Sequence, residues 1–219
     1  MKNWWKILSV VLLMYVMIMG FLGEVPRQPI LNESVRNLYF HVTMWFSMMA
    51  LLITSVWYSV KYLRNPLEEY DDKAVEFAYT GILFGVLGLI TGSLWARFTW
   101  GAWWTNDPKL NSVAIGMLIY FAYIILRGSF QDELQRGRIS AVYNIFAFVI
   151  FMVLIWILPR MTDSLHPGNG GNPGFKPMDT KGTMQIVFRP AIVGWILLGV
   201  WITTLRLRLK KLERIQKEL

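Results

Sequence analysis

The sequence predicts an all-α integral membrane protein with six transmembrane helices and with both termini in the cytoplasm. Hydrophobic residues make up 55% of the 219 residues and charged residues only 16%, which is too few to cover the surface of a soluble domain. Apolar stretches of about twenty residues, the length that crosses a bilayer as a helix, recur along the chain. Lysine and arginine are concentrated in alternate connecting segments, as expected for a chain that crosses a membrane repeatedly.

The predicted spans form one six-helix membrane domain, residues 1–205, followed by a basic cytoplasmic tail, residues 206–219. The first span is interpreted as an uncleaved helix. The reason is that Gly20-Phe21-Leu22-Gly23 does not resemble the cleavage site of a secretory signal peptide. The expected spans are approximately residues 4–21, 38–60, 74–94, 111–126, 139–158 and 186–205.

The third span contains four glycines that form two pairs of small residues, each pair four positions apart. They are Gly81, Gly85, Gly88 and Gly92. Small residues at this spacing let the backbones of two membrane helices approach closely. We therefore expect the third helix to pack tightly against a neighbour.

The distribution of basic residues orients the chain. Fourteen of the 22 Lys and Arg residues lie in the four segments expected on the inner side, and eight lie in the three outer segments. Basic residues favour the cytoplasmic side of a membrane, so both termini are expected there. The inner segments are residues 1–6, 61–73, 127–138 and 206–217, and the outer segments are residues 24–36, 97–109 and 160–189.

The composition also excludes several functions. The chain has no cysteine, which rules out disulfide bonds, thiolate metal sites and thiol exchange within it. The net charge of +8 does not indicate nucleic acid as a partner, because the basic tail lacks the aromatic groups that stack on bases. The sequence contains no phosphate-binding loop, so this chain is not expected to hydrolyse ATP.

A Trp-rich segment, residues 95–110, lies in the outer region between the third and fourth spans. It contains four of the eleven tryptophans, Trp95, Trp100, Trp103 and Trp104. One interpretation is a membrane-interface belt, which accounts for one or two tryptophans per helix end. The other is a platform for a flat apolar ligand, with Arg97 and Lys109 meeting carboxylates on that ligand.

The chain has only two histidines, His41 and His166, and both are expected at the same outer face as the Trp-rich segment. Each can be an ordinary hydrogen-bonding residue of the interface. Two neutral imidazoles that face each other across a flat aromatic site instead form an axial pair for heme iron. Because His166 precedes a stretch rich in Gly and Pro, residues 167–174, which is expected to be a mobile lid or turn, we expect it to be the releasable ligand.

Arg189 is expected in the outer turn of the sixth span, where a buried cation is costly. One interpretation is that its aliphatic stem stays in the membrane while its guanidinium extends to the outer headgroups. The alternative interpretation pairs Arg189 with a heme propionate. In the same region, Asp107 and Pro108 are expected to begin the fourth helix, because proline suits its first position.

The Trp-rich segment resembles the signature of the heme-handling proteins of cytochrome c biogenesis, in particular the heme exporter protein C (CcmC) family. The size, the six spans and one histidine on either side of the segment are similar as well. Asn106 departs from the tryptophan usual before the aspartate, and Lys109 departs from the usual arginine and resembles the CcsA branch. The matching run is Trp100-Gly101-Ala102-Trp103-Trp104-Thr105-Asn106-Asp107-Pro108-Lys109-Leu110.

The resemblance implies that His41 and His166 are axial ligands of a non-covalent, b-type heme. It further implies a multi-pass protein of the bacterial inner membrane with its site on the periplasmic face. Its partners would be a periplasmic heme chaperone and the ATP-hydrolysing subunits of an ABC transporter complex, besides membrane lipid. Heme contacts are implied for Trp100, Gly101, Trp104, Asp107 and Leu110.

Two other functions remain compatible with the sequence. A small b-type cytochrome that carries electrons would use the same histidine pair, usually placed inside the helix bundle. A permease subunit without heme would use the tryptophans only as interfacial anchors.

Overall fold

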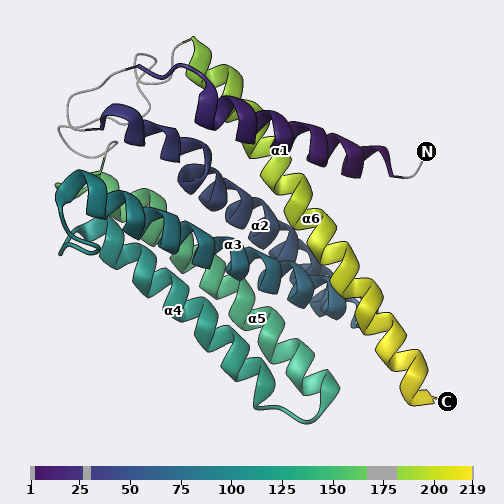
Figure 1. The fold of residues 1–219 in the computed structure, drawn as a ribbon. Coiled ribbons are helices and arrows are strands. Elements are labelled where there is room, and N and C mark those ends of the chain that lie inside the picture. The colour runs from purple at the N-terminus through teal and green to yellow at the C-terminus, as the bar shows by residue number, and fades with distance from the viewer. Residues whose placement is uncertain (1–2, 27–30, 167–181, 219) are drawn as a thin grey trace.

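The structure, a computed structural model, describes residues 3–26, 31–166 and 182–218. In this part of the chain every regular element is a helix, and six helices are long and apolar enough to cross a membrane, which confirms the predicted fold class (Figure 1). The elements are α1 (Trp4–Leu22), η1 (Asn32–Tyr39), α2 (His41–Arg64), α3 (Glu68–Trp100), α4 (Pro108–Gly128), α5 (Glu133–Met152), η2 (Val153–Ile157), η3 (Leu158–Arg160) and α6 (Thr183–Glu218).

Helix α2 lies at the centre of the bundle, where it packs against α3, α5 and α6. Helix α1 packs against α6 on one side, and α4 packs against α5 on the other (Figure 1). The interior between α2, α3, α4 and α5 is filled by large, closely packed apolar side chains. This core includes Met48, Leu51, Leu52, Phe84, Met117, Tyr120 and Phe151.

The glycines of α3 let α2 approach closely, as the sequence predicts. A Cβ atom at Gly81 would lie 2.9 Å from Leu52, and one at Gly88 would lie 2.8 Å from the ring of Trp45. Near the end of the row, a Cβ at Gly92 would lie 2.5 Å from Cε1 of His41. The row of small residues therefore positions the imidazole of His41.

Several helices extend beyond the expected spans. Helix α3 continues to Trp100, so that the first part of the Trp-rich segment is helical. A 3-10 helix, η1, precedes α2 and makes His41 the first residue of α2. Neither feature was predicted, because Arg97 marked the end of the third apolar span and the residues of η1 are mostly polar.

Helix α6 continues through residue 205, where the sequence predicted the start of a basic tail, and runs to Glu218. Basic residues of this extension form ion pairs with acidic residues in the first turns of α3. The extension is therefore packed against the bundle. The pairs are Arg206–Glu76 at 2.5 Å, Lys210–Asp72 at 2.7 Å and Arg214–Asp72 at 2.5 Å.

Pro190 interrupts the hydrogen bonding of α6 near its outer end. Proline has no N–H to donate to the carbonyl group four residues earlier, which here belongs to Ile186. The hydroxyl of Tyr15 on α1 donates to this carbonyl at 3.5 Å. A neighbouring helix thus satisfies the group that proline leaves open, as membrane helices require.

Candidate functional site

The imidazole of His41 is held between α2 and α3 by aromatic rings and one carbonyl group. Its ring centroid lies 6.2 Å from that of Trp45 and 5.9 Å from that of Trp95, both in edge-to-face orientation. Nδ1 of His41 is 3.0 Å from the carbonyl oxygen of Gly88. Because a carbonyl oxygen can only accept, Nδ1 is the donor, and in the neutral ring the lone pair is on Nε2.

Hydrogen bonds between η1 and α3 hold the side chains that surround His41. The indole Nε1 of Trp95 donates to Oγ of Ser34 at 3.0 Å. The amide of Asn37 donates to the carbonyl oxygen of Thr91 at 2.9 Å. Helix η1 therefore holds Trp95 in its place beside His41.

His166 is bound to the carboxylate of Asp107. Nδ1 of His166 lies 3.1 Å from Oδ1 of Asp107. The backbone N–H of His166 donates to Oγ of Ser164 at 3.1 Å. The ring of Trp100 packs edge-to-face on the imidazole, with ring centroids 4.8 Å apart.

Asp107 itself is almost completely buried, and its two oxygens connect two segments of the chain. As the N-cap of α4, it accepts from the backbone N–H of Lys109 at 2.9 Å and of Leu110 at 3.3 Å, which confirms the predicted helix start at Pro108. Its other oxygen accepts from the Ser164 hydroxyl at 2.7 Å and from the Leu165 N–H at 2.8 Å.

The electrostatics of this cluster favour a neutral imidazole at His166. Burial and the nearby Lys109 ammonium lower the pKa of His166 to about 4, and the Asp107 carboxylate only partly opposes them. Although burial disfavours the charged form of Asp107, hydrogen bonds from Ser164 and Leu165 hold the pKa of this carboxyl below its ordinary value. At neutral pH, His166 therefore donates from Nδ1 to an ionised carboxylate and has its lone pair on Nε2.

Helix α2, of which His41 is the first residue, begins at the end of the bundle away from the two termini, and α5, which leads through η2 and η3 to His166, ends there (Figure 1). Trp95, which contacts His41, and Trp100, which contacts His166, are five residues apart in the last turns of α3. The structure therefore brings together His41, His166, Asp107, Trp95 and Trp100.

The rest of the Trp-rich segment forms the rim of this region. Gly101 ends α3 with φ of +79°, a left-handed conformation that suits glycine, and its carbonyl oxygen accepts from the guanidinium of Arg97. Ser93 donates to the carbonyl oxygen of Trp103 at 2.8 Å. Trp103 and Trp104 remain 57% and 43% exposed, which leaves aromatic surface for a partner.

The remaining predicted residues lie in different surroundings. Leu110 is buried in the first turn of α4, while Lys109 is half-buried and interacts with its surroundings. Arg189 is exposed on α6 and donates to Oε1 of Gln185 at 2.8 Å. No described contact joins Arg189 to either histidine. The stretch at residues 167–174 lies outside the described residues.

Sequence reasoning missed several residues of the site. Trp45 and the Gly88 carbonyl contact His41, and Ser164 supports both Asp107 and His166. Trp45 follows His41 by four residues, a spacing that puts both on one face of a helix and could have been noticed. Ser164 gave no signal, since its contact with Asp107 spans 57 residues.

Comparisons with known proteins place the chain in a family. All 219 residues match the family model of heme exporter protein C, CcmC. Heme exporter protein C of Escherichia coli (strain K12) is 26% identical, with 94% of this chain and 81% of the relative aligned. The Bradyrhizobium diazoefficiens protein of the same name is 28% identical over 84% of this chain and 72% of the relative.

A shorter match relates the chain to a second group. The cytochrome c biogenesis protein CcsA of Prochlorococcus marinus is 37% identical over 83 residues, which is 38% of this chain and 26% of the relative. This agrees with the predicted likeness to the CcsA branch. The chain nevertheless matches heme exporter protein C over its whole length. It belongs to the heme exporter protein C family, a multi-pass membrane family that handles heme in cytochrome c biogenesis.

Proposed function

We propose that the protein holds heme at the periplasmic end of the bundle, with Nε2 of His41 and Nε2 of His166 as axial ligands of the iron, and passes it to a periplasmic heme chaperone. Heme is the cargo of this reaction. It is bound without a covalent link, as b-type heme is. The protein supplies ligation, orientation and shelter from water, while the redox chemistry remains with the iron.

The hydrogen bonding of the two histidines carries this proposal. A histidine that binds a metal through one nitrogen commonly donates from its other nitrogen to a carboxylate or a carbonyl group, which fixes its tautomer and orientation. His41 meets the Gly88 carbonyl in this way and His166 meets Asp107. Both rings thus have the donor set that fits axial ligation of heme.

The residues around the pair fit the other parts of heme. Trp100, Trp103 and Trp104 offer aromatic surface to the porphyrin, with Gly101 and Leu110 beside them. Arg97, Lys109 and Arg189 are the cations proposed to meet the propionates. Trp95 contacts His41 directly and keeps the ring in place.

The proposed location is the bacterial inner membrane with both termini in the cytoplasm. Six spans put the two termini on one side, and the excess of basic residues on that side favours the cytoplasm. Since the sequence has no phosphate-binding loop, ATP hydrolysis is assigned to separate subunits of an ABC transporter complex.

The absorption spectrum of the purified full-length protein tests the proposal. We expect a Soret band in the parent protein and a large loss of it in His41→Ala and in His166→Ala. Trp201→Phe, at the opposite end of the bundle, serves as a control and should retain the band. Equal Soret absorbance in all four proteins would contradict ligation by these histidines.

A second measurement separates transfer from the other functions. Heme that leaves the parent protein for an apo-chaperone supports transfer. Heme that stays bound while it cycles with quinol would instead indicate an electron carrier. Normal cytochrome c maturation with His41→Ala would indicate a permease subunit in which the tryptophans only anchor the chain.

A further inference from the structure

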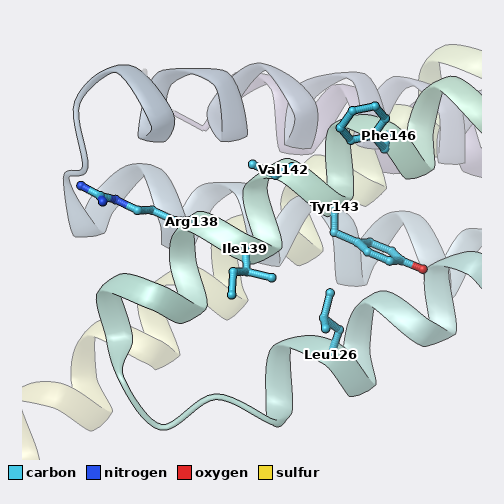
Figure 2. A pocket seen from close by; sticks show the side chains of 6 residues that line it. All are labelled: Leu126, Arg138, Ile139, Val142, Tyr143 and Phe146. Atoms are coloured by element: carbon cyan, nitrogen blue, oxygen red, sulfur yellow. The ribbon is translucent and has the colours of Figure 1, made fainter.

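A groove between α4 and α5 lies near the end of the bundle that carries both termini, opposite the histidines. It has a volume of about 400 Å³. Figure 2 shows the side chains that line it, with Leu126 on α4 and the others on α5. They are Leu126, Arg138, Ile139, Val142, Tyr143 and Phe146.

The lining of the groove is apolar except at Arg138. Val142 and Phe146 are 43% and 65% exposed, so they face the surroundings of the bundle, which in a membrane are acyl chains. The hydroxyl of Tyr143 donates to the carbonyl oxygen of Ile119 at 3.0 Å, which leaves the ring as an apolar wall. The groove therefore suits a hydrocarbon chain.

Arg138 differs from the other arginines at the turn between α4 and α5. Arg127 is paired with Asp71 at 2.5 Å, and Arg136 is paired with Glu133 at 3.0 Å. Arg138 is exposed and has no carboxylate within ion-pair distance among the described residues. Its charge is therefore available to an anion at the membrane surface, at the edge of the apolar groove.

We propose that this groove binds an anionic phospholipid, with an acyl chain along Leu126, Val142 and Phe146 and with the phosphate at Arg138. Basic groups at the cytoplasmic ends of membrane helices attract anionic headgroups by about 1 kcal/mol per cation, which corresponds to about fivefold in affinity. The site is independent of heme, because it lies at the other end of the bundle and shares no residue with the histidine cluster.

Native mass spectrometry of the purified full-length protein tests the site, with phosphatidylglycerol and phosphatidylethanolamine as the probes. We expect the parent protein to retain phosphatidylglycerol in preference to phosphatidylethanolamine. Arg138→Gln should reduce this preference about fivefold. Arg208→Gln is the matched control, since Arg208 is also exposed at this end of the bundle but lies on α6, away from the groove.

Two further experiments distinguish a bound lipid from other molecules that could occupy the groove. Val142→Trp fills the groove and should lower retention of both lipids, with the remaining preference for phosphatidylglycerol unchanged. Glycerol 3-phosphate, which has the anion but no chain, should not displace bound phosphatidylglycerol. Three outcomes would overturn the proposal. They are equal retention of the two lipids by the parent, an unchanged preference for phosphatidylglycerol in Arg138→Gln, and displacement of bound phosphatidylglycerol by glycerol 3-phosphate.

Discussion

Asp107 and His166 are 59 residues apart in the sequence, and Oδ1 of the carboxylate lies 3.1 Å from Nδ1 of the imidazole. The same oxygen also accepts from the first backbone N–H groups of α4. The orientation of His166 is therefore tied to the start of a membrane helix. In the family signature, this aspartate supports a proposed iron ligand and does not have to touch the iron itself.

Replacing Asp107 tests its two roles, as the cap of α4 and as the hydrogen-bond partner of His166. Asp107→Ala removes the cap of α4, which costs about 0.5–2 kcal/mol of stability. It also releases His166, so we expect the affinity for heme to fall about 10–100-fold, the usual effect of removing a group that supports a metal ligand, and heme to dissociate faster. Transfer of heme to apomyoglobin measures the rate, and thermal unfolding measures the stability.

Asp132→Ala is the matched control for this experiment. Asp132 caps α5 at the opposite end of the bundle and accepts from Gln135 N–H at 2.6 Å. Its loss should lower stability by a similar amount and leave the rate of heme dissociation unchanged. The same rate of heme loss in both variants would show that Asp107 acts only as a cap.

Gly92→Ala should displace the imidazole of His41. The added Cβ would lie 2.5 Å from Cε1 of the ring, closer than any normal contact. We expect less heme in the purified variant, with the helix content unchanged because alanine favours helices. The heme-to-protein ratio and far-ultraviolet circular dichroism provide the two measurements.

Gly81→Ala is the control in the same row of glycines, since its Cβ would meet Leu52 at 2.9 Å and no histidine. It should lower stability and leave heme content per folded molecule at the parent level. If both glycine variants lose heme equally, general loosening of the contact between α2 and α3 explains the effect, and positioning of His41 does not.

Trp100→Leu should shorten the residence of heme. The edge-to-face contact of Trp100 with His166 has a centroid distance of 4.8 Å, and such pairs contribute about 0.5–1.5 kcal/mol. Its loss should accelerate heme release by up to about tenfold. Stopped-flow transfer to apomyoglobin measures the rate, and Trp57→Leu, at the inner end of α2, should match the parent. An unchanged rate in Trp100→Leu would contradict this role.

The ion pair of Arg127 with Asp71 should stabilise the bundle without affecting heme. The side chain of Arg127 is buried and that of Asp71 nearly so, at 7% and 14% exposure, and breaking a buried pair typically costs about 3–5 kcal/mol. We expect a large fall in the melting temperature for Arg127→Met. Arg136→Met, which breaks the exposed pair with Glu133, should cost less than about 1 kcal/mol.

The double variant of Arg127→Met with Asp71→Leu completes the test. Removing both charges leaves no buried ion without a partner, so most of the stability should return. Heme content per folded molecule should equal that of the parent in all these variants. A double variant as unstable as Arg127→Met would mean that packing around the arginine, and not the ion pair, provides the stability.

The sequence predicted the six spans and the close packing at the glycines, because both follow from local features, namely apolar length and the spacing of small residues. It also predicted that Asp107 caps α4, since Asp-Pro before an apolar run is a local signal. The length of α3 and the helical extension of α6 were missed. Their polar ends are stabilised by ion pairs between distant segments, such as Arg206 with Glu76, and hydropathy does not report such pairs.

For the candidate site, residue types could be selected from the sequence, but their contacts could not. The rarity of histidine and the clustering of tryptophan singled out one end of the bundle as the candidate site. The partners of those histidines are a backbone carbonyl of α3 and a carboxylate 59 residues away. Residue spacing in the sequence does not predict either contact, because both form only when distant segments of the chain come together in the fold.

Pro190 divides α6 into two sections with different neighbours. The inner section is held to α3 by ion pairs of Arg206, Lys210 and Arg214, whereas the outer section packs its buried Met184, Val187 and Phe188 against α1 and η1. At the proline, the helix lacks one of its own hydrogen bonds, and only the long bond from Tyr15 spans the gap. Amide hydrogens just before Pro190 should exchange with solvent well before those of the inner section do.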